Sequence, residues 1–411
     1  QAIEGKVAGV RVTQASGDPS GNFSIQVRGA TSITSSNNPL YVVDGMATDD
    51  IHFLNPADIE SMQILKDASS CAIYGARAAN GVVLITTKRG KSGKPLVTLN
   101  TTFGISQVNK KLDLLNTRQL VSLINDERLN AGLPSAASLD TITTDNDWQD
   151  IIYGQAVSSN IQLAFSGGND KTRFYTSVNR FNNDGVIDPS TYQRYTFKLN
   201  LDHEMYSWLS FGTNVNISRS KSKNIKDNAT INEGGTVLGA LSTPSFVEQY
   251  TAEGYFGYNP FDGQANPLSS MYGSNSASRS SNLLGNLFAK IKITPYLSFK
   301  SSVGIDADFT NYDNFTYVEK SAYAVSTGGG ADANSGQGIT TLFENILDYS
   351  QHFGKHAISS VLGMTAQKYE GENAWLSVRG FPNSSVQTLN AASTATSFGT
   401  QKYESALLSY L

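Results

Sequence analysis

The block DIESMQILKDASSCAIYGARAANGVVLITTKRG, residues 58–90, has a pattern that the rest of the chain does not repeat. Its residues predict a strand, a short helix, a tight turn and a second strand, at 59–65, 68–74, 80–81 and 82–88. Asp67 can cap the helix, because a carboxylate accepts hydrogen bonds from the first free amides. The block therefore predicts a compact unit of mixed helix and strand.

Shorter apolar runs precede this block. They predict strands at 7–13, 23–28 and 40–44, separated by turns rich in Gly, Asn and Ser. Together with the block they predict a small α+β domain with one sheet over residues 1–94.

From residue 95 onward the strands lengthen and alternate apolar with polar residues. In residues 195–202 the apolar face is Tyr195, Phe197, Leu199 and Leu201, and the polar face is Thr196, Lys198, Asn200 and Asp202. Residues 209–218 and 297–309 repeat this alternation, which is typical of strands with two different environments. Ten strands can be drawn between residues 96 and 411.

The connections between these strands alternate in length. Long connections are expected at about 107–158, 219–281, 313–340 and 370–400, and short turns lie between them. Within the first, Asn116 and Gln119 can form a capping box, so residues 116–131 predict a helix. Outer-membrane barrels place tight turns at the periplasmic end and long loops at the extracellular end. A soluble two-sheet β protein, whose strands also alternate, remains the alternative.

Composition excludes several classes of function. Charged residues make up 16% of the 411 residues and the net charge is −4, which gives no electrostatic basis for nucleic-acid binding. One cysteine and four histidines, without metal-ligand spacing on a helix, predict no metal site and no cofactor. No catalytic constellation is found, so we expect no enzyme.

Three segments carry a resemblance to a known family: SIQVRG at 24–29, NPLYVVDG at 38–45 and the stretch 55–90. They resemble the plug of TonB-dependent outer-membrane transporters, and most closely the SusC/RagA family of the Bacteroidetes. The resemblance implies a mainly β fold. A large antiparallel transmembrane β-barrel, of 22 strands in the family and about ten here, would hold a small α+β plug domain in its lumen. Residues 1–94, hereafter the plug region, would be the C-terminal part of that plug, and 95–411 the first part of the barrel.

The resemblance also implies a function and partners. The protein would import an oligosaccharide or oligopeptide across the outer membrane, and the sequence does not choose between them. A SusD-like surface lipoprotein would cover the barrel, the TonB complex of the inner membrane would supply energy, and two such pairs could form a dimer. The TonB box would lie upstream of Gln1, so we expect the chain to be a part of a longer one. The alternatives are a passive porin, a docking scaffold or adhesin that transports nothing, and a soluble α+β enzyme.

Two groups of residues are candidates for function in this family. The first would hold and release the plug by pairing with the barrel wall: Arg28, Lys66, Arg77, Asp58 and Glu60. Lys88 and Arg89 could pair with wall acids in the same way, for which Asp202, Asp306, Asp308, Glu344 and Asp348 are available. The second group, on a loop, could contact substrate: Asn37, Asn38 and Tyr41. The alternative is that these are ordinary solvated residues, and Asp58 with Glu60 lacks the His or nucleophile that acid–base catalysis would need.

Overall fold

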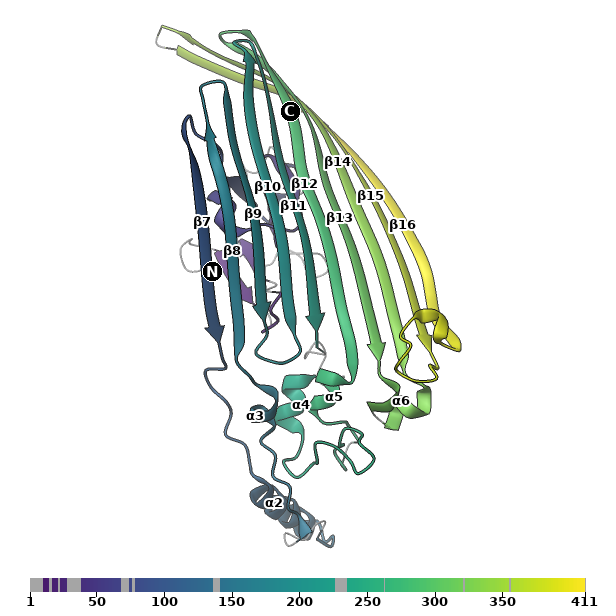
Figure 1. Cartoon of the computed structure of the whole chain (residues 1–411). Coiled ribbons are helices and arrows are strands. Elements are labelled where there is room, and N and C mark those ends of the chain that lie inside the picture. Colours follow the sequence, from purple (N-terminus) through teal and green to yellow (C-terminus); the bar gives the residue numbers. More distant parts are fainter. Residues whose placement is uncertain are drawn as a thin grey trace.

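The computed structural model shows a broad curved sheet with a smaller unit against one face and helices at one end (Figure 1). It describes residues 10–14, 17–20, 23–27, 38–67, 74–75, 78–135, 141–225, 235–261, 263–320, 322–354 and 356–410. No helix in these ranges is long and apolar enough to cross a membrane.

The large sheet has ten antiparallel strands, and each pairs with the next along the chain. They are β7 (Gly93–Ser106), β8 (Ala156–Gly168), β9 (Thr172–Asp184), β10 (Thr191–Tyr206), β11 (Leu209–Asn224), β12 (Ser274–Thr294), β13 (Leu297–Thr316), β14 (Gly330–Phe353), β15 (His356–Arg379) and β16 (Thr394–Tyr410). The predicted number of strands is confirmed. Several strands run further than predicted, because Gly- and Asn-rich stretches that suggest loops continue the ladder in register.

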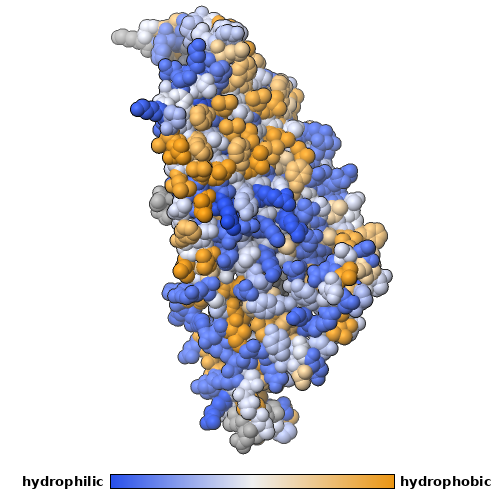
Figure 2. Space-filling model, in the orientation of Figure 1, coloured by the Kyte–Doolittle hydropathy of each residue, from blue (hydrophilic) through white to orange (hydrophobic). Residues whose placement is uncertain are grey.

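The two faces of the large sheet show the opposite burial pattern to that of a soluble protein, with apolar side chains exposed and polar ones buried. Large apolar side chains point outward into open surroundings, as with Leu99 (65% exposed) and Val303 (57% exposed). They form a band across the upper part of the outer face in Figure 2. Polar side chains of the other face are buried, as with Lys198 and Asn200. Exposing this face to water would cost roughly 25 cal/mol per Å² of apolar surface, so its residue distribution is that of a barrel wall that faces lipid. The ten strands form one sheet, so the alternative of a soluble two-sheet β protein is wrong.

Connections at the lower end of the sheet in Figure 1 carry short helices, and the upper end has tight turns. The helices are α2 (Thr117–Asn130), α3 (Trp148–Ile152), α4 (Thr236–Ser242), α5 (Pro267–Tyr272) and α6 (Ala322–Thr327), with single 3-10 turns η4 (Val318–Lys320) and η5 (Leu389–Ala391). Helix α2 begins with the capping box that Asn116 and Gln119 predict. An apolar cluster that includes Trp148, Phe256 and Met271 packs these loops together.

The plug region lies behind the large sheet in Figure 1. It has two sheets, so the prediction of one sheet is wrong. Strands β1 (Val10–Gln14) and β2 (Phe23–Val27) pair with each other and with no other described strand, while β3 (Leu40–Val43), β4 (Met46–Thr48), β5 (Ile59–Leu65) and β6 (Val82–Thr87) form the order β4-β3-β6-β5. The β1–β2 pair is separate because Ile25 and Val27 pack onto the apolar core of the other sheet instead of extending it. Residues 68–73 of the predicted helix lie outside the described residues.

A tight hairpin joins β3 to β4. Its two turn residues, Asp44 and Gly45, have φ of 49° and 91°, which a two-residue type I′ turn requires. Strand β3 is parallel to β6, with Val43 opposite Ile85. Parallel neighbours end at the same edge of a sheet, so Asp44 and Thr87 come together there although they are 43 residues apart.

Candidate functional site

The plug region is held mainly by the inward face of one strand, β10. Arg194 donates to the carbonyl of His52, and Lys198 pairs with Asp44. Further along, Asn200 donates to Thr87 Oγ1 (2.8 Å) and to the carbonyl of Lys88 (2.7 Å). These wall residues belong to the polar set that the alternation of 195–202 predicts, or continue it toward Arg194. Strand β10 therefore forms a row of docking positions for the plug region.

The centre of this row is a buried ion pair. Lys198 Nζ lies 3.0 Å from Asp44 Oδ2, and both side chains are only 2% exposed. Thr87 donates its amide (3.0 Å) and its hydroxyl (2.5 Å) to the same carboxylate. Burial raises the pKa of Asp44, but the Lys198 ammonium and the Thr87 donors outweigh burial and hold this pKa below its ordinary value. The Asp44 carboxylate is therefore charged and buried, and each of its two oxygens accepts a hydrogen bond.

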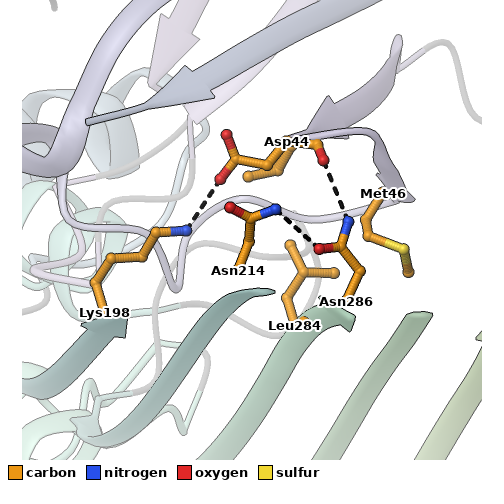
Figure 3. Close-up of a pocket in the computed structure, with 8 residues that line it drawn as sticks. Asp44, Met46, Lys198, Asn214, Leu284 and Asn286 are labelled. Carbon is orange, nitrogen blue, oxygen red and sulfur yellow. Dashed lines mark hydrogen bonds and ion pairs between the residues drawn. The ribbon is translucent and has the colours of Figure 1, made fainter. Parts of the chain in front are cut away.

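A small cavity lies beside the ion pair, with room for about one water molecule. Figure 3 shows Met46 and Leu284 on its apolar side, and Asn214 donating to Asn286 (2.8 Å) on its polar side. Asn286 in turn donates to the backbone carbonyl of Asp44 (3.3 Å). The tip of the β3–β4 hairpin is thus held by β10, β11 and β12 together.

A second anchor is Asp58, which ends the short 3-10 turn η1 (Pro56–Asp58). Its Oδ1 accepts hydrogen bonds from Gln162 (2.6 Å), Tyr175 (2.7 Å) and Ser177 (2.7 Å). These donors come from β8 and β9, and all four side chains are buried. Three neutral wall donors on one carboxylate oxygen make Asp58 a binding contact between the plug region and the wall.

A third contact lies where the plug region ends. Arg89 reaches both oxygens of Asp202 at 3.2 Å, which is one of the pairings considered from the sequence. Both side chains are partly exposed, so we expect this pair to contribute about 1 kcal/mol at most. Gly90 follows directly, and a Cβ there would clash with the backbone of Phe174 on β9. Only glycine lets the chain cross the wall so closely.

The other predicted residues are placed as follows. Arg28, Arg77 and Asn37 lie outside the described residues. Glu60 and Asn38 are exposed, and Lys66 is half-buried just after β5. Tyr41 is 5% exposed and lies in the apolar core of the plug region, which does not present it to a substrate. Burial, with a smaller effect of Asp50, raises the pKa of Tyr41 to about 12.

The residues that form the central contact were not among the predicted site residues. Asp44 and Lys198 are both visible in the patterns, the first in a turn dipeptide and the second on a polar strand face. Within the described ranges no group of His, Cys, Asp and Glu side chains could hold a metal ion. The site is a set of docking contacts between two parts of one chain.

Comparisons with known proteins agree with this architecture. The family model described as TonB-dependent Receptor Plug Domain matches residues 1–82. The chain is 34% identical over 397 residues to TonB-dependent receptor P3 of Formosa agariphila, spanning 95% of this chain and 38% of that protein. It is 31% identical over 334 residues to TonB-dependent receptor SusC of Bacteroides thetaiotaomicron, spanning 74% of this chain and 32% of that protein.

Solved structures give the same result. The RagAB peptide importer in its closed-closed state superposes with a TM-score of 0.85 at 27% identity, over 100% of this chain and 50% of that one. The ferric citrate transporter FecA shares the fold alone, with a TM-score of 0.52 at 9% identity. The chain spans about a third to a half of these proteins. With its plug match, its curated relatives and its structural neighbours, the chain belongs to the SusC/RagA-type TonB-dependent receptors, of which it represents a part.

Proposed function

We propose that this chain is part of a receptor that imports a nutrient across the bacterial outer membrane with energy from the TonB complex. In this proposal residues 1–94 are the plug and 95–411 the first part of the barrel. The loops that carry α2 to α6 face outward, and the receptor has no enzymatic activity of its own.

The observation that supports import best is how the plug region is held. A permanent structural core would be packed by apolar surface, whereas this interface consists mainly of separate polar contacts around one ion pair. Each neutral hydrogen bond contributes only about 1 kcal/mol net, because water replaces it on release. A plug held in this way closes the lumen at rest and can be displaced by a pull. A passive porin would have no use for such a plug.

The partners follow from the relatives. RagAB is a peptide importer, and SusC is 31% identical to this chain over 334 residues. We propose a SusD-like surface lipoprotein over the loop end of this barrel, pairing of two such complexes into a dimer, and an oligosaccharide or oligopeptide as the nutrient.

A reversible lock between plug and wall tests the proposal. Thr87 Oγ1 and Asn200 Nδ2 are 2.8 Å apart, so T87C with N200C, in a C71S background, places two thiols across the interface. We expect cells that depend on the full-length receptor to lose growth on oligosaccharide or oligopeptide mixtures when the lock is oxidised, and to regain it with a reductant. Each single cysteine variant is the control.

The competing function is a docking scaffold or adhesin that transports nothing. A scaffold would hold its surface partners equally well with the plug locked or free. Growth that is unaffected by the oxidised lock, with the cross-link confirmed on a gel, would therefore reject import through plug displacement.

A further inference from the structure

The inward face of β13 to β16 carries a surface that the plug region touches at its edge, where Thr48 lies within hydrogen-bonding reach of Asp306. Its orientation follows from Gly304 on β13, where a Cβ would clash with Met46 of the plug region. Alternate residues of a strand share a face, so Asp306, Asp308 and Tyr312 face inward as well. Directly opposed residues of antiparallel strands also share a face, which extends this assignment across β14, β15 and β16.

Four rows of opposed residues make up this surface, named here the lumen patch. From the loop end they are Tyr312, Asn334, Trp375 and Gly399; then Thr310, Gly336, Asn373 and Gln401; then Asp308, Gly338, Gly371 and Tyr403; then Asp306, Thr340, Tyr369 and Ser405. The patch contains aromatic, amide, hydroxyl, carboxyl and glycine residues. None of these residues is aliphatic and none is cationic.

The glycines set how the aromatic rings lie. A Cβ on Gly399 would clash with the six-membered ring of Trp375, and a Cβ on Gly371 would clash with the ring of Tyr403. Each ring therefore covers a glycine on the neighbouring strand and lies along the wall. The rings remain open on the lumen side, with Trp375 38% and Tyr403 42% exposed. Tyr369 adjoins Tyr403, with ring centroids 5.7 Å apart.

The position of the lumen patch along the strands bears on what it can contact. The row nearest the plug hairpin contains Asp306, which is the next inward-facing residue of β13 after Gly304. The row nearest the outer loops contains Tyr312, which is six residues further along β13 and roughly 20 Å closer to the loop end. The patch thus runs along the lumen wall from the plug hairpin toward the outer loops, where a molecule admitted from outside would meet it.

We propose that the lumen patch is a substrate subsite for a neutral oligosaccharide. This inference rests on the proposed import function and selects one of its two substrate classes. Flat, exposed rings pack against the C–H faces of pyranose rings, and adjacent amides and hydroxyls exchange hydrogen bonds with sugar hydroxyls. A peptide would be served better by aliphatic pockets or charges of both signs, which the patch lacks. Two carboxylates without a cation disfavour sulfated or uronic sugars.

Calorimetric titration of the purified full-length receptor in detergent tests the subsite without transport. The probes are maltohexaose, cellohexaose and xylohexaose, a sulfated hexasaccharide, and a mixed hexapeptide. The variants are W375A and Y403A, and the matched control is F398A, which removes an outward-facing ring on β16, opposite Leu376. We expect at least one neutral probe to bind, and each patch variant to weaken it about tenfold while F398A leaves it unchanged.

Several results would overturn the inference: no binding of any neutral probe, equal binding by wild type and patch variants, or preferential binding of the peptide or the sulfated sugar. These results leave the import proposal standing if the disulfide lock still stops growth. If the lock has no effect but the neutral sugar binds through Trp375 and Tyr403, import fails and the subsite remains.

Discussion

Replacing Lys198 with methionine isolates the energetic role of the buried ion pair. The substitution keeps most of the side-chain volume and removes the only cation within 4.0 Å of Asp44 among the described residues. The carboxylate then stays 2% exposed with its charge balanced only by the two Thr87 donors. Breaking one side of a buried pair costs about 3–5 kcal/mol, so the free energy of opening this contact should fall by that amount.

Hydrogen–deuterium exchange measures the opening directly. The Thr87 amide donates to Asp44, so peptides that cover residues 40–48 and 82–90 report the contact. A loss of 3 kcal/mol or more raises their exchange on the order of a hundredfold or above. K300M is the matched control, because Lys300 places its ammonium over the Phe288 ring within the large sheet, 5.0 Å from the centroid.

The double variant D44N/K198M completes the test. Removing both charges together avoids an unpaired buried ion, so we expect it to recover most of the lost protection. If K198M exchanges like wild type, or if the double variant is as unprotected as K198M, the ion pair does not hold the plug region and the reasoning is refuted.

Three further perturbations follow from the same contacts. D58L leaves three buried wall donors unpaired and should lower plug protection by several kcal/mol, at about 1–3 kcal/mol each, whereas E60L at an exposed site should change little in the same exchange assay. G90V should reduce the yield of folded receptor, seen as loss of the heat-modifiable band on a gel, because a side chain cannot pass Phe174; a normal yield would contradict the close crossing. Because the pKa of Asp44 is depressed in the folded state, its charge contributes its full stabilisation of the folded state above the unfolded pKa of about 3.9. This contribution is lost as the pH falls through the lower pKa of the folded state. Exchange of residues 82–90 should therefore be insensitive to this group at pH 5–8, after correction for intrinsic rates, and a loss of protection near pH 6 would contradict the assignment.

The sequence predicted the strands and their two faces better than it predicted the site. The alternation in 195–202 correctly assigned Lys198 and Asn200 to a polar face, because a period of two depends only on neighbouring residues. Asp44 was assigned to a strand end, yet it has two roles: its positive φ makes the turn, and its carboxylate binds the wall. The second role depends on the parallel pairing of β3 with β6 and on the register of β10, and neither is encoded locally.

Strand length was also underestimated, for a related reason. Residues 330–341, with three glycines and many small polar side chains, have the composition of a loop. In the structure they pair along their whole length with β13 and β15. The glycines are there because inward-facing side chains of adjacent strands cover them, as Asn373 Oδ1 does at Gly336 and Asp308 Oδ1 at Gly338. A glycine that accommodates a neighbour's side chain cannot be distinguished from a loop glycine without the pairing partner.

The inner face of the large sheet thus changes character across its width. On β8 to β10 it presents amides, hydroxyls and one ammonium at positions matched to fixed atoms of the plug region, which explains why Gln162, Ser177 and Lys198 are buried. On β13 to β16 it presents rings laid over glycines, which leave flat open area. A wall that holds a plug needs individual donors in register with it, whereas a wall that meets successive sugar units needs a surface that tolerates sliding. The polar face of the same alternation meets both requirements, so one strand pattern accounts for the docking contacts on one side of the lumen and for the proposed ligand surface on the other.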